Sequence, residues 1–152
     1  MDNVTFPPID YSARDYVKIG TSYSNARVWD VKILSIKESF NILDTENAGR
    51  VIEKGQMTLD RIGTFYGHTI TFGRNGNSSS ARNEYDNLFN FLAYPWNDGI
   101  FIEAIHNQYK IAYVAYTSTG ERELAYIDEK NHIINWKNFS CNFIPMFAQV
   151  TP

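Results

Sequence analysis

One stretch of the chain, residues 66–95, constrains the fold most, because it combines a strand, a tight turn and a helix. Between Tyr66 and Phe72, aromatic, histidine and isoleucine side chains alternate with glycine and threonine. This period of two is typical of a β-strand with two unlike faces. The Arg74-Asn-Gly that follows predicts a chain reversal, since asparagine and glycine tolerate positive φ. The stretch therefore begins as a strand that ends at a sharp turn.

A helix is predicted from about Ala81 to Tyr94, with Ser80 as its N-cap and Pro95 ending it. One such helix cannot bury its apolar stripe alone and must lie against a sheet. The sequence therefore predicts an α+β fold, in which a mainly antiparallel β-barrel or sandwich carries one packed α-helix. At helical spacing, one face of the helix holds the apolar side chains Ala81, Tyr85, Leu88, Phe89 and Leu92, and the other holds mostly Arg82, Asn83, Asp86, Asn87 and Asn90.

The remaining strands follow from alternation and from turn residues. Arg27–Phe40 is predicted as a long strand in which Trp29, Val31 and Ile33 face inward, followed by Leu34 and Ile36. The change of parity at Ile33-Leu34 indicates a β-bulge or a strand that changes sheets. A polar turn is predicted at 41–50, and further strands at 51–59, 61–72, 100–105, 109–118, 121–127 and 136–150, with breaks or bulges at Gly55 and Gly63 and an edge or bulge at Pro145.

The chain of 152 residues is long enough for one core, and we expect an N-terminal extended arm (1–26) followed by one domain (27–152). The arm contains Pro7-Pro8, which favours extended backbone, and no sustained period. A disordered tail is the alternative to a docked arm. The arm carries more apolar side chains than a solvating tail, so we expect it to dock on its own body or on a neighbouring subunit. These side chains are Phe6, Ile9, Tyr11, Tyr16, Val17 and Ile19.

Charge and composition argue against several classes of partner. The formal net charge is -3, so the broad basic field that binds nucleic-acid phosphates is missing and no sequence-specific nucleic acid binding is expected. No apolar run approaches the ~20 residues of a spanning helix, and the chain's start does not resemble a signal peptide, so no membrane insertion is expected. Cys141 is the one cysteine, which excludes an intrachain disulfide.

The sequence contains no pattern that predicts a metal or cofactor site. His68, His106 and His132 are far apart in the chain, and none has a second ligand at a spacing typical of zinc sites. The acidic segment Asp44–Gly49 lacks the ligand spacing and closing glutamate of a calcium loop and is interpreted as a solvated turn. We therefore expect no metal and no cofactor.

Catalytic chemistry is not predicted either. The chain has no Gly-x-Ser-x-Gly elbow, and Lys54-Gly55 is not part of a phosphate-binding loop. Asp60 beside Arg61, and Glu121 and Glu123 around Arg122, could be catalytic carboxylates, but exposed ion pairs on strands explain them equally well. No catalytic residue is therefore assigned.

The excess of aromatic residues, with ten Tyr, ten Phe and three Trp, suits both pleated sheets and subunit interfaces. Tyr109, Tyr113, Tyr116 and Tyr126 could also form a sugar-stacking platform. The alternative function is thus a carbohydrate-binding module for host-surface glycans. Against this alternative, alternating tyrosines on paired strands are also what the wall of a barrel requires.

Five segments carry a family resemblance that covers residues 27–152. They look like small tail-region proteins of phages and prophages of Gram-positive bacteria, and their order is similar to the tail-tube and distal-tail-protein fold. The segments are Val28–Phe40, Asn47–Arg50, Arg61–Thr64, Gly73-Arg-Asn-Gly with Glu84-Tyr-Asp, and Asn142–Met146.

The resemblance implies a structural virion protein, a subunit of a phage tail tube or of a distal tail or baseplate ring. It would act by self-assembly into a homo-oligomeric ring and by contacts with other phage tail proteins, using edge strands, hairpins and the arm. The implied location is the virion, after assembly in the cytoplasm of the bacterial host. The family brings no active site with it.

Overall fold

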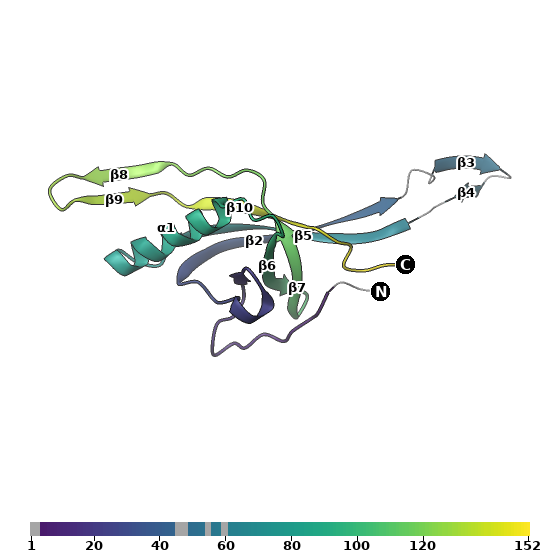
Figure 1. Ribbon diagram of the computed structural model, residues 1–152, viewed down its shortest axis with the longest axis horizontal. Coiled ribbons are helices and arrows are strands. Elements are labelled where there is room, and N and C mark those ends of the chain that lie inside the picture. The colour runs from purple at the N-terminus through teal and green to yellow at the C-terminus, as the bar shows by residue number, and fades with distance from the viewer. Residues whose placement is uncertain (1–3, 45–48, 54–55, 59–60) are drawn as a thin grey trace.

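The computed structural model describes residues 4–44, 49–53, 56–58 and 61–152. These residues form ten strands, one α-helix and a short 3-10 helix at Tyr23–Asn25. The architecture is mainly antiparallel sheet with one packed helix, which confirms the predicted α+β class (Figure 1).

Six strands form one antiparallel sheet in the order β1-β6-β7-β10-β5-β2. β10 belongs to both halves of this sheet, since its residues 139–143 pair with β5 and Ile144 and Pro145 pair with β7. The sheet therefore changes direction at β10, and its two halves pack face to face as a sandwich. The strands are β1 (Lys18–Gly20), β2 (Val31–Asp44), β5 (Arg61–Arg74), β6 (Ile100–His106), β7 (Tyr109–Tyr116) and β10 (Phe139–Pro145).

The sheet does not close, so of the two predicted architectures the sandwich is correct and the barrel is wrong. Among the described residues, the edge strands β1 and β2 form ladders with β6 and β5 alone, β1 has one further bridge to Arg27, and no ladder joins the two edges. The physical reason is the shortness of β1, whose three residues leave most of the length of β2 without a possible partner. Pro145 lies where β10 passes from β5 to β7, consistent with the bulge or edge predicted for this proline.

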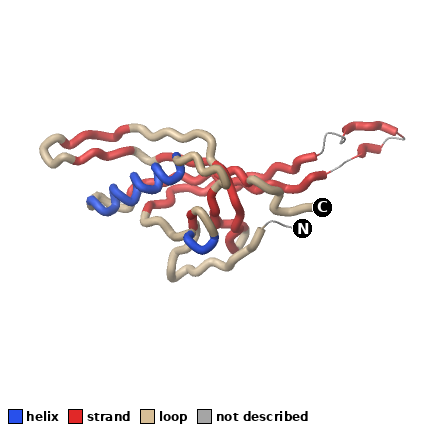
Figure 2. Tube along the Cα trace, in the orientation of Figure 1, coloured by secondary structure: helices blue, strands red, loops and turns tan. Residues whose placement is uncertain are grey.

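Two hairpins project from the sandwich in opposite directions (Figure 2). One is the far half of the β2–β5 ribbon, beyond which β3 (Gly49–Glu53) and β4 (Gln56–Thr58) form a further pair. The other consists of β8 (Leu124–Asp128) and β9 (Ile133–Trp136). The last predicted strand, 136–150, is thus divided between β9 and β10, and the predicted strand 121–127 begins only at Leu124.

The polar turn predicted at 41–50 is wrong for its first four residues and for Gly49 and Arg50, which begin β3. Asn41 to Asp44 continue β2 and pair with β5, because β5 itself runs back to Arg61 and offers them a partner. The segment 45–48 and Gly55 lie outside the described residues. The strand predicted at 51–59 is divided between β3 and β4.

The helix α1 spans Ser79–Ala93, and its N-cap is Ser78 and not Ser80. The Ser78 hydroxyl accepts a hydrogen bond from the Ala81 amide at 3.1 Å, and Ser78 has the extended backbone of a cap, whereas Ser80 is already helical. The predicted apolar stripe is confirmed, with Phe89 partly buried and the other four side chains buried against the sheet. These four are Ala81, Tyr85, Leu88 and Leu92.

The facing of β5 and the bulge in β2 follow the sequence prediction. His68, Ile70 and Phe72 are buried on one face of β5. The register of β2 against β5 shifts between Ile33 and Ser35, which confirms the bulge. Leu34 was expected to face inward and does not: it is the extra residue of the bulge and is 44% exposed.

The N-terminal arm docks on the body of its own chain, and the disordered-tail alternative is wrong for the described residues. Thr5 exchanges backbone hydrogen bonds with Ala112, and the Lys110 amide donates to the carbonyl of Pro7 at 2.9 Å. Farther along, β1 pairs with β6, and Val17 and Ile19 belong to the core. The division of the chain at Ala26 into arm and domain stays a prediction.

Replacing Leu88 with alanine should lower the free energy of unfolding by about 2–5 kcal/mol, because its side chain is fully buried between α1 and the sheet and would leave a cavity. Asn90→Ala, on the exposed face of the same helix, is the control and should change stability far less. Urea denaturation measures both. Equal losses for the two variants would contradict the facing of the helix.

Candidate assembly surfaces

The apolar face of the β2–β5 ribbon continues beyond the core that covers it. Alternate residues of β2 share a face, and Ile36 and Glu38 point toward the sandwich interior. The next two residues on this face, Phe40 and Ile42, are 64% and 45% exposed. Ile62, the extra residue where the β2–β5 register shifts next to Asp44, is 45% exposed. The ribbon therefore presents to solvent an apolar surface of the kind that the rest of the sheet buries.

The cover ends because the opposing hairpin ends. β6 and β7 cross this face and turn back between His106 and Tyr109. The ring of His106 lies 4.8 Å from that of Tyr66, which faces Phe40 across the ribbon. Beyond this contact, no described segment lies over Phe40 and Ile42.

The β5 side of the same ribbon is covered beyond β10, although its face is not. Where β10 leaves β5, the chain's last segment takes its place: Thr64 forms a backbone bridge with Val150. The side chain of Gln149, fully buried, accepts from the Tyr66 amide at 2.9 Å and donates to the Tyr66 carbonyl at 2.8 Å. Pairing of a foreign strand on the β5 side is therefore blocked, whereas among the described residues β2 has no ladder partner other than β5. A neighbour could contact the exposed face or the edge of β2.

The second projecting hairpin also exposes large apolar side chains. On β8 and β9, Tyr126, Ile127 and Ile134 are each more than half exposed. Arg122, just before β8, fixes the hairpin over α1. Its guanidinium bonds to Asp86 at 2.8 Å and lies 4.1 Å and 4.2 Å from the ring centres of Phe89 and Trp136. The aromatic stacking and the ion pair orient the hairpin along the helix.

A polar cluster lies inside the sandwich where the exposed ribbon begins. The Glu38 carboxylate is 2.6 Å from His106 Nδ1 and 3.2 Å from His68 Nε2. His68 Nε2 is also 3.1 Å from the Ile105 carbonyl, and its Nδ1 is 2.6 Å from the Tyr113 hydroxyl. Both neighbours of Nε2 are acceptors, so the neutral ring carries its proton there and accepts a hydrogen bond from Tyr113 at Nδ1.

Burial lowers the pKa of His68 below its ordinary value of 6.5, although the Ile105 carbonyl and Glu38 act in the opposite direction. Burial also raises the pKa of Tyr113, which stays protonated and remains a donor. The cluster therefore holds a neutral histidine at neutral pH. No signal in the sequence links His68 with His106, because residues this far apart in a chain are brought together only by the packing of two sheet halves.

Acid should destabilise the protein through His68. A histidine whose pKa is lower in the folded chain binds more protons when unfolded, so stability present above pH 6.5 is lost as the pH falls below that value. Urea denaturation at about pH 7.5 and about pH 5.5 measures this. The loss between the two should be larger for the wild type than for His68→Gln.

The control for this experiment is His132→Asn in the β8–β9 turn, where His132 is exposed and has a φ of 56° that asparagine tolerates. This variant should lose as much stability as the wild type. Equal acid losses in His68→Gln and wild type would contradict the assignment of this response to His68.

The other residues considered from the sequence do not form a common site. Glu123 pairs with Lys137 at 2.9 Å on the surface, and Arg122 pairs with Asp86, so these residues form ion pairs with other partners and not, as predicted, with each other. Asp60 lies outside the described residues. Asp44 bonds to Arg61 at 3.1 Å within the ribbon. Within the described ranges, no three His, Cys, Asp or Glu side chains are arranged to hold a metal ion.

The four tyrosines do not form one sugar-stacking platform. Tyr113 is buried and bonded to His68, while Tyr116 and Tyr126 are 44% and 52% exposed on separate strands. The exposed apolar surface at Phe40 and Ile42, in contrast, is not among the sites predicted from the sequence. The alternation that continues from Phe40 through Ile42 is the signal that could have extended the strand beyond its predicted end.

No helix among the described residues has the length and apolar character needed to cross a membrane.

No protein-family model and no curated protein sequence matches the chain. Two solved structures are loosely similar to it. A chain from the virion of a native gene transfer agent (GTA) particle has 8% identity and a TM-score of 0.48, covering 90% of this chain and 95% of that chain. A chain from the tail of an empty GTA particle, with C6 symmetry, has 9% identity and a TM-score of 0.49, covering 90% and 94%. Likenesses at this level assign no function to this chain.

Proposed function

We propose that this protein is a structural virion protein, a subunit of a phage tail tube or of a distal tail or baseplate ring. It acts by self-assembly and by contacts with neighbouring tail proteins, in the virion, after assembly in the host cytoplasm. The observation that carries the proposal is the apolar face of the β2–β5 ribbon, which continues beyond the core with Phe40 and Ile42 exposed.

Burial of these side chains against a neighbour supports association. Each large apolar side chain removed from water contributes roughly 1.5–3 kcal/mol. The ribbon and the β8–β9 hairpin project in opposite directions (Figure 1), so one subunit offers two different surfaces to two neighbours. Such heterologous contacts generate rings when the rotation closes. The segments that resemble phage tail-region proteins supply the biological setting.

The test places two charges on the exposed face. Wild-type protein at micromolar concentration should form rings or tubes, seen by electron microscopy and as large species in mass photometry. Phe40→Asp with Ile42→Asp should remain monomeric, because association would then bury two unpaired carboxylates. Its circular dichroism melt should stay close to that of the wild type, since both side chains are already exposed.

The matched control is Ser39→Asp with Asn41→Asp, which adds the same charges to the opposite face of the same strand. This variant should assemble like the wild type. A wild type that stays monomeric, or a Phe40/Ile42 variant that assembles as well as the control, would refute the proposed interface.

A further inference from the structure

The segment that contains β7 and β8 runs antiparallel to the segment that contains β9 and β10. The two segments pair at both ends but not in the middle, and the register of the pairing is the same before and after the interruption. Tyr116 pairs with Ile144 at the end of β7, and Leu124 pairs with Trp136 at the start of β8. The number of residues from Tyr116 to Leu124 on one segment equals the number from Trp136 to Ile144 on the other. The two segments are therefore halves of one long antiparallel pair that separate and then rejoin.

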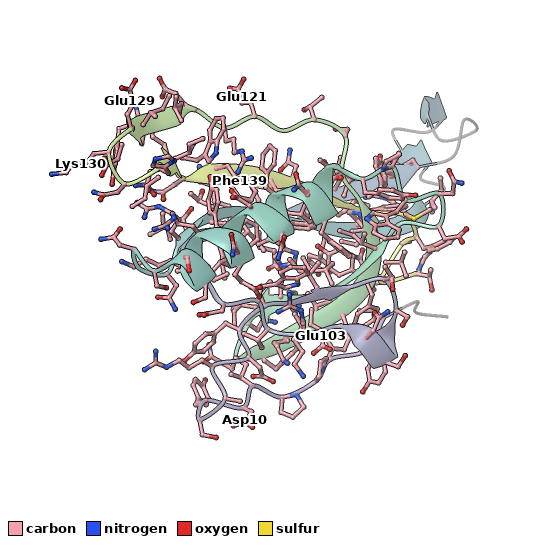
Figure 3. The ribbon with its side chains drawn as sticks, turned by 60° about the vertical axis from the view of Figure 1, so that its left-hand side comes forward. Asp10, Glu103, Glu121, Glu129, Lys130 and Phe139 are labelled. Carbon is pink, nitrogen blue, oxygen red and sulfur yellow. The ribbon has the colours of Figure 1, made fainter. Side chains whose placement is uncertain are left out.

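Between these pairs the strands are apart. No backbone hydrogen bond joins residues 117–122 to residues 138–143, all of which the structure describes; the ladder resumes with the Lys137 amide donating to the Glu123 carbonyl at 2.8 Å. Two adjoining cavities of about 440 Å³ and 830 Å³ occupy the space. Both are lined by Thr119 and Gly120 from one segment and by Phe139 and Ser140 from the other. Figure 3 labels Glu121 and Phe139 on the two sides.

Side-chain anchors at both ends of 117–122 hold this segment away from β10. The Thr117 hydroxyl donates to the Leu92 carbonyl at the end of α1 at 2.9 Å. Arg122 bonds to Asp86 on the same helix at 2.8 Å and stacks on Phe89. The segment is thus attached to the helix at the two positions where it would otherwise begin to pair with β10.

The separated edge of β10 carries backbone groups that have no backbone partner among the described residues, although the Cys141 thiol donates to the Asn142 carbonyl over a long distance of 3.9 Å. The Met146 amide donates to the Val114 carbonyl, so alternate residues preceding Met146 direct their backbone polar groups to the β7 side. These residues include Asn142 and Ser140, whose β7-side partners are absent, while the other edge of β10 is engaged with β5. A strand edge of this kind binds an extended chain through its backbone.

The walls of the gap indicate which side chains such a chain would carry. The smaller cavity is lined by apolar groups, among them Phe89, Leu92 and the buried Cys141. Glu121 at the rim of the larger cavity forms no interaction with any described residue, whereas Arg122 and Lys137 are already paired with Asp86 and Glu123. The gap therefore favours apolar side chains on the helix side and a basic one at the rim.

We infer that this gap is an acceptor site for an extended peptide strand of a partner protein, with alternating apolar residues and a basic residue at one end. The strand adds to the free edge of β10 at Ser140 and Asn142. This goes beyond the proposed assembly function, since neither Phe40 nor Ile42 lines the gap and a monomer already contains the whole site.

The test uses a fluorescent peptide of alternating valine and threonine with a terminal lysine, titrated with monomeric protein at nanomolar concentration. Fluorescence anisotropy should show saturable binding. Ser140→Pro, which removes the edge amide, should weaken binding about tenfold or more. Ser140→Ala keeps the amide and should bind like the wild type, although it loses the hydroxyl contact with Thr71.

A reversible lock tests the gap without depending on the folding of the proline variant. Gly120 lies opposite Ser140 in the interrupted register, so Gly120→Cys with Ser140→Cys can form a disulfide only when the segments come together. The oxidised protein should lose peptide binding and regain it on reduction. Phe40→Asp with Ile42→Asp should bind the peptide normally, which separates this site from the assembly interface. Absence of binding to the wild type, or binding that is unchanged by both the proline and the lock, would overturn the inference.

Discussion

Lys110→Met should lower the free energy of unfolding by about 3–5 kcal/mol, the loss typical of breaking a buried ion pair by removing one partner. Lys110 is 1% exposed, and its ammonium lies 2.8 Å from the carboxylates of both Asp15 and Glu103. Burial disfavours the charge on Lys110, but the hydrogen bonds to the two carboxylates more than offset it and raise its pKa. Without the ammonium, two buried carboxylates face each other with no cation between them.

The control is Lys18→Met. Lys18 is 4.0 Å from the same Asp15 carboxylate but has a side chain that is 33% exposed. Its loss should cost at most about 1 kcal/mol, as for surface ion pairs. Urea denaturation compares the two variants, and adding Asp15→Asn and Glu103→Gln to Lys110→Met should recover part of the loss. If Lys110→Met is no less stable than Lys18→Met, the triad is not a structural element.

Deletion of residues 1–26 should prevent the remaining chain from folding. The deletion removes β1 from the edge of β6, the core side chains Val17 and Ile19, and the Asp15 partner of Lys110. Two buried aliphatic side chains contribute roughly 1.5–3 kcal/mol each, and a broken buried ion pair about 3–5 kcal/mol more. The total lies within the roughly 5–15 kcal/mol by which most domains are stable.

The matched truncation removes residues 1–9 and keeps Asp15, β1 and the core contacts. It should fold with a modestly lower melting temperature, because it loses the pairing of Thr5 with Ala112 and the bond to the Pro7 carbonyl. Circular dichroism melts and sedimentation of both proteins decide the matter. A 27–152 fragment that melts like the full chain would establish the domain boundary at Ala26 that the sequence predicts.

The local elements of this protein are determined by its sequence. The alternation of His68, Ile70 and Phe72, the apolar stripe of α1 and the parity change near Ile33 each specify a face through the geometry of a single strand or helix. Errors occurred where a second segment takes part: β2 continues to Asp44 because β5 is there to pair with it, and Leu34 is exposed because the bulge in the β2–β5 register ejects it.

Only the tertiary structure decided which residues meet. The Glu38–His68–His106 cluster, and the contact of Asp15 with the Lys110–Glu103 pair of the β6–β7 hairpin, join residues far apart in the chain, so no spacing in the sequence marks them. The same holds for the uncovered face at Phe40 and Ile42: the sequence determines that the face is apolar, but how far β6 and β7 reach across it determines where the core ends. Alternation is a property of one strand, whereas burial depends on what packs against it.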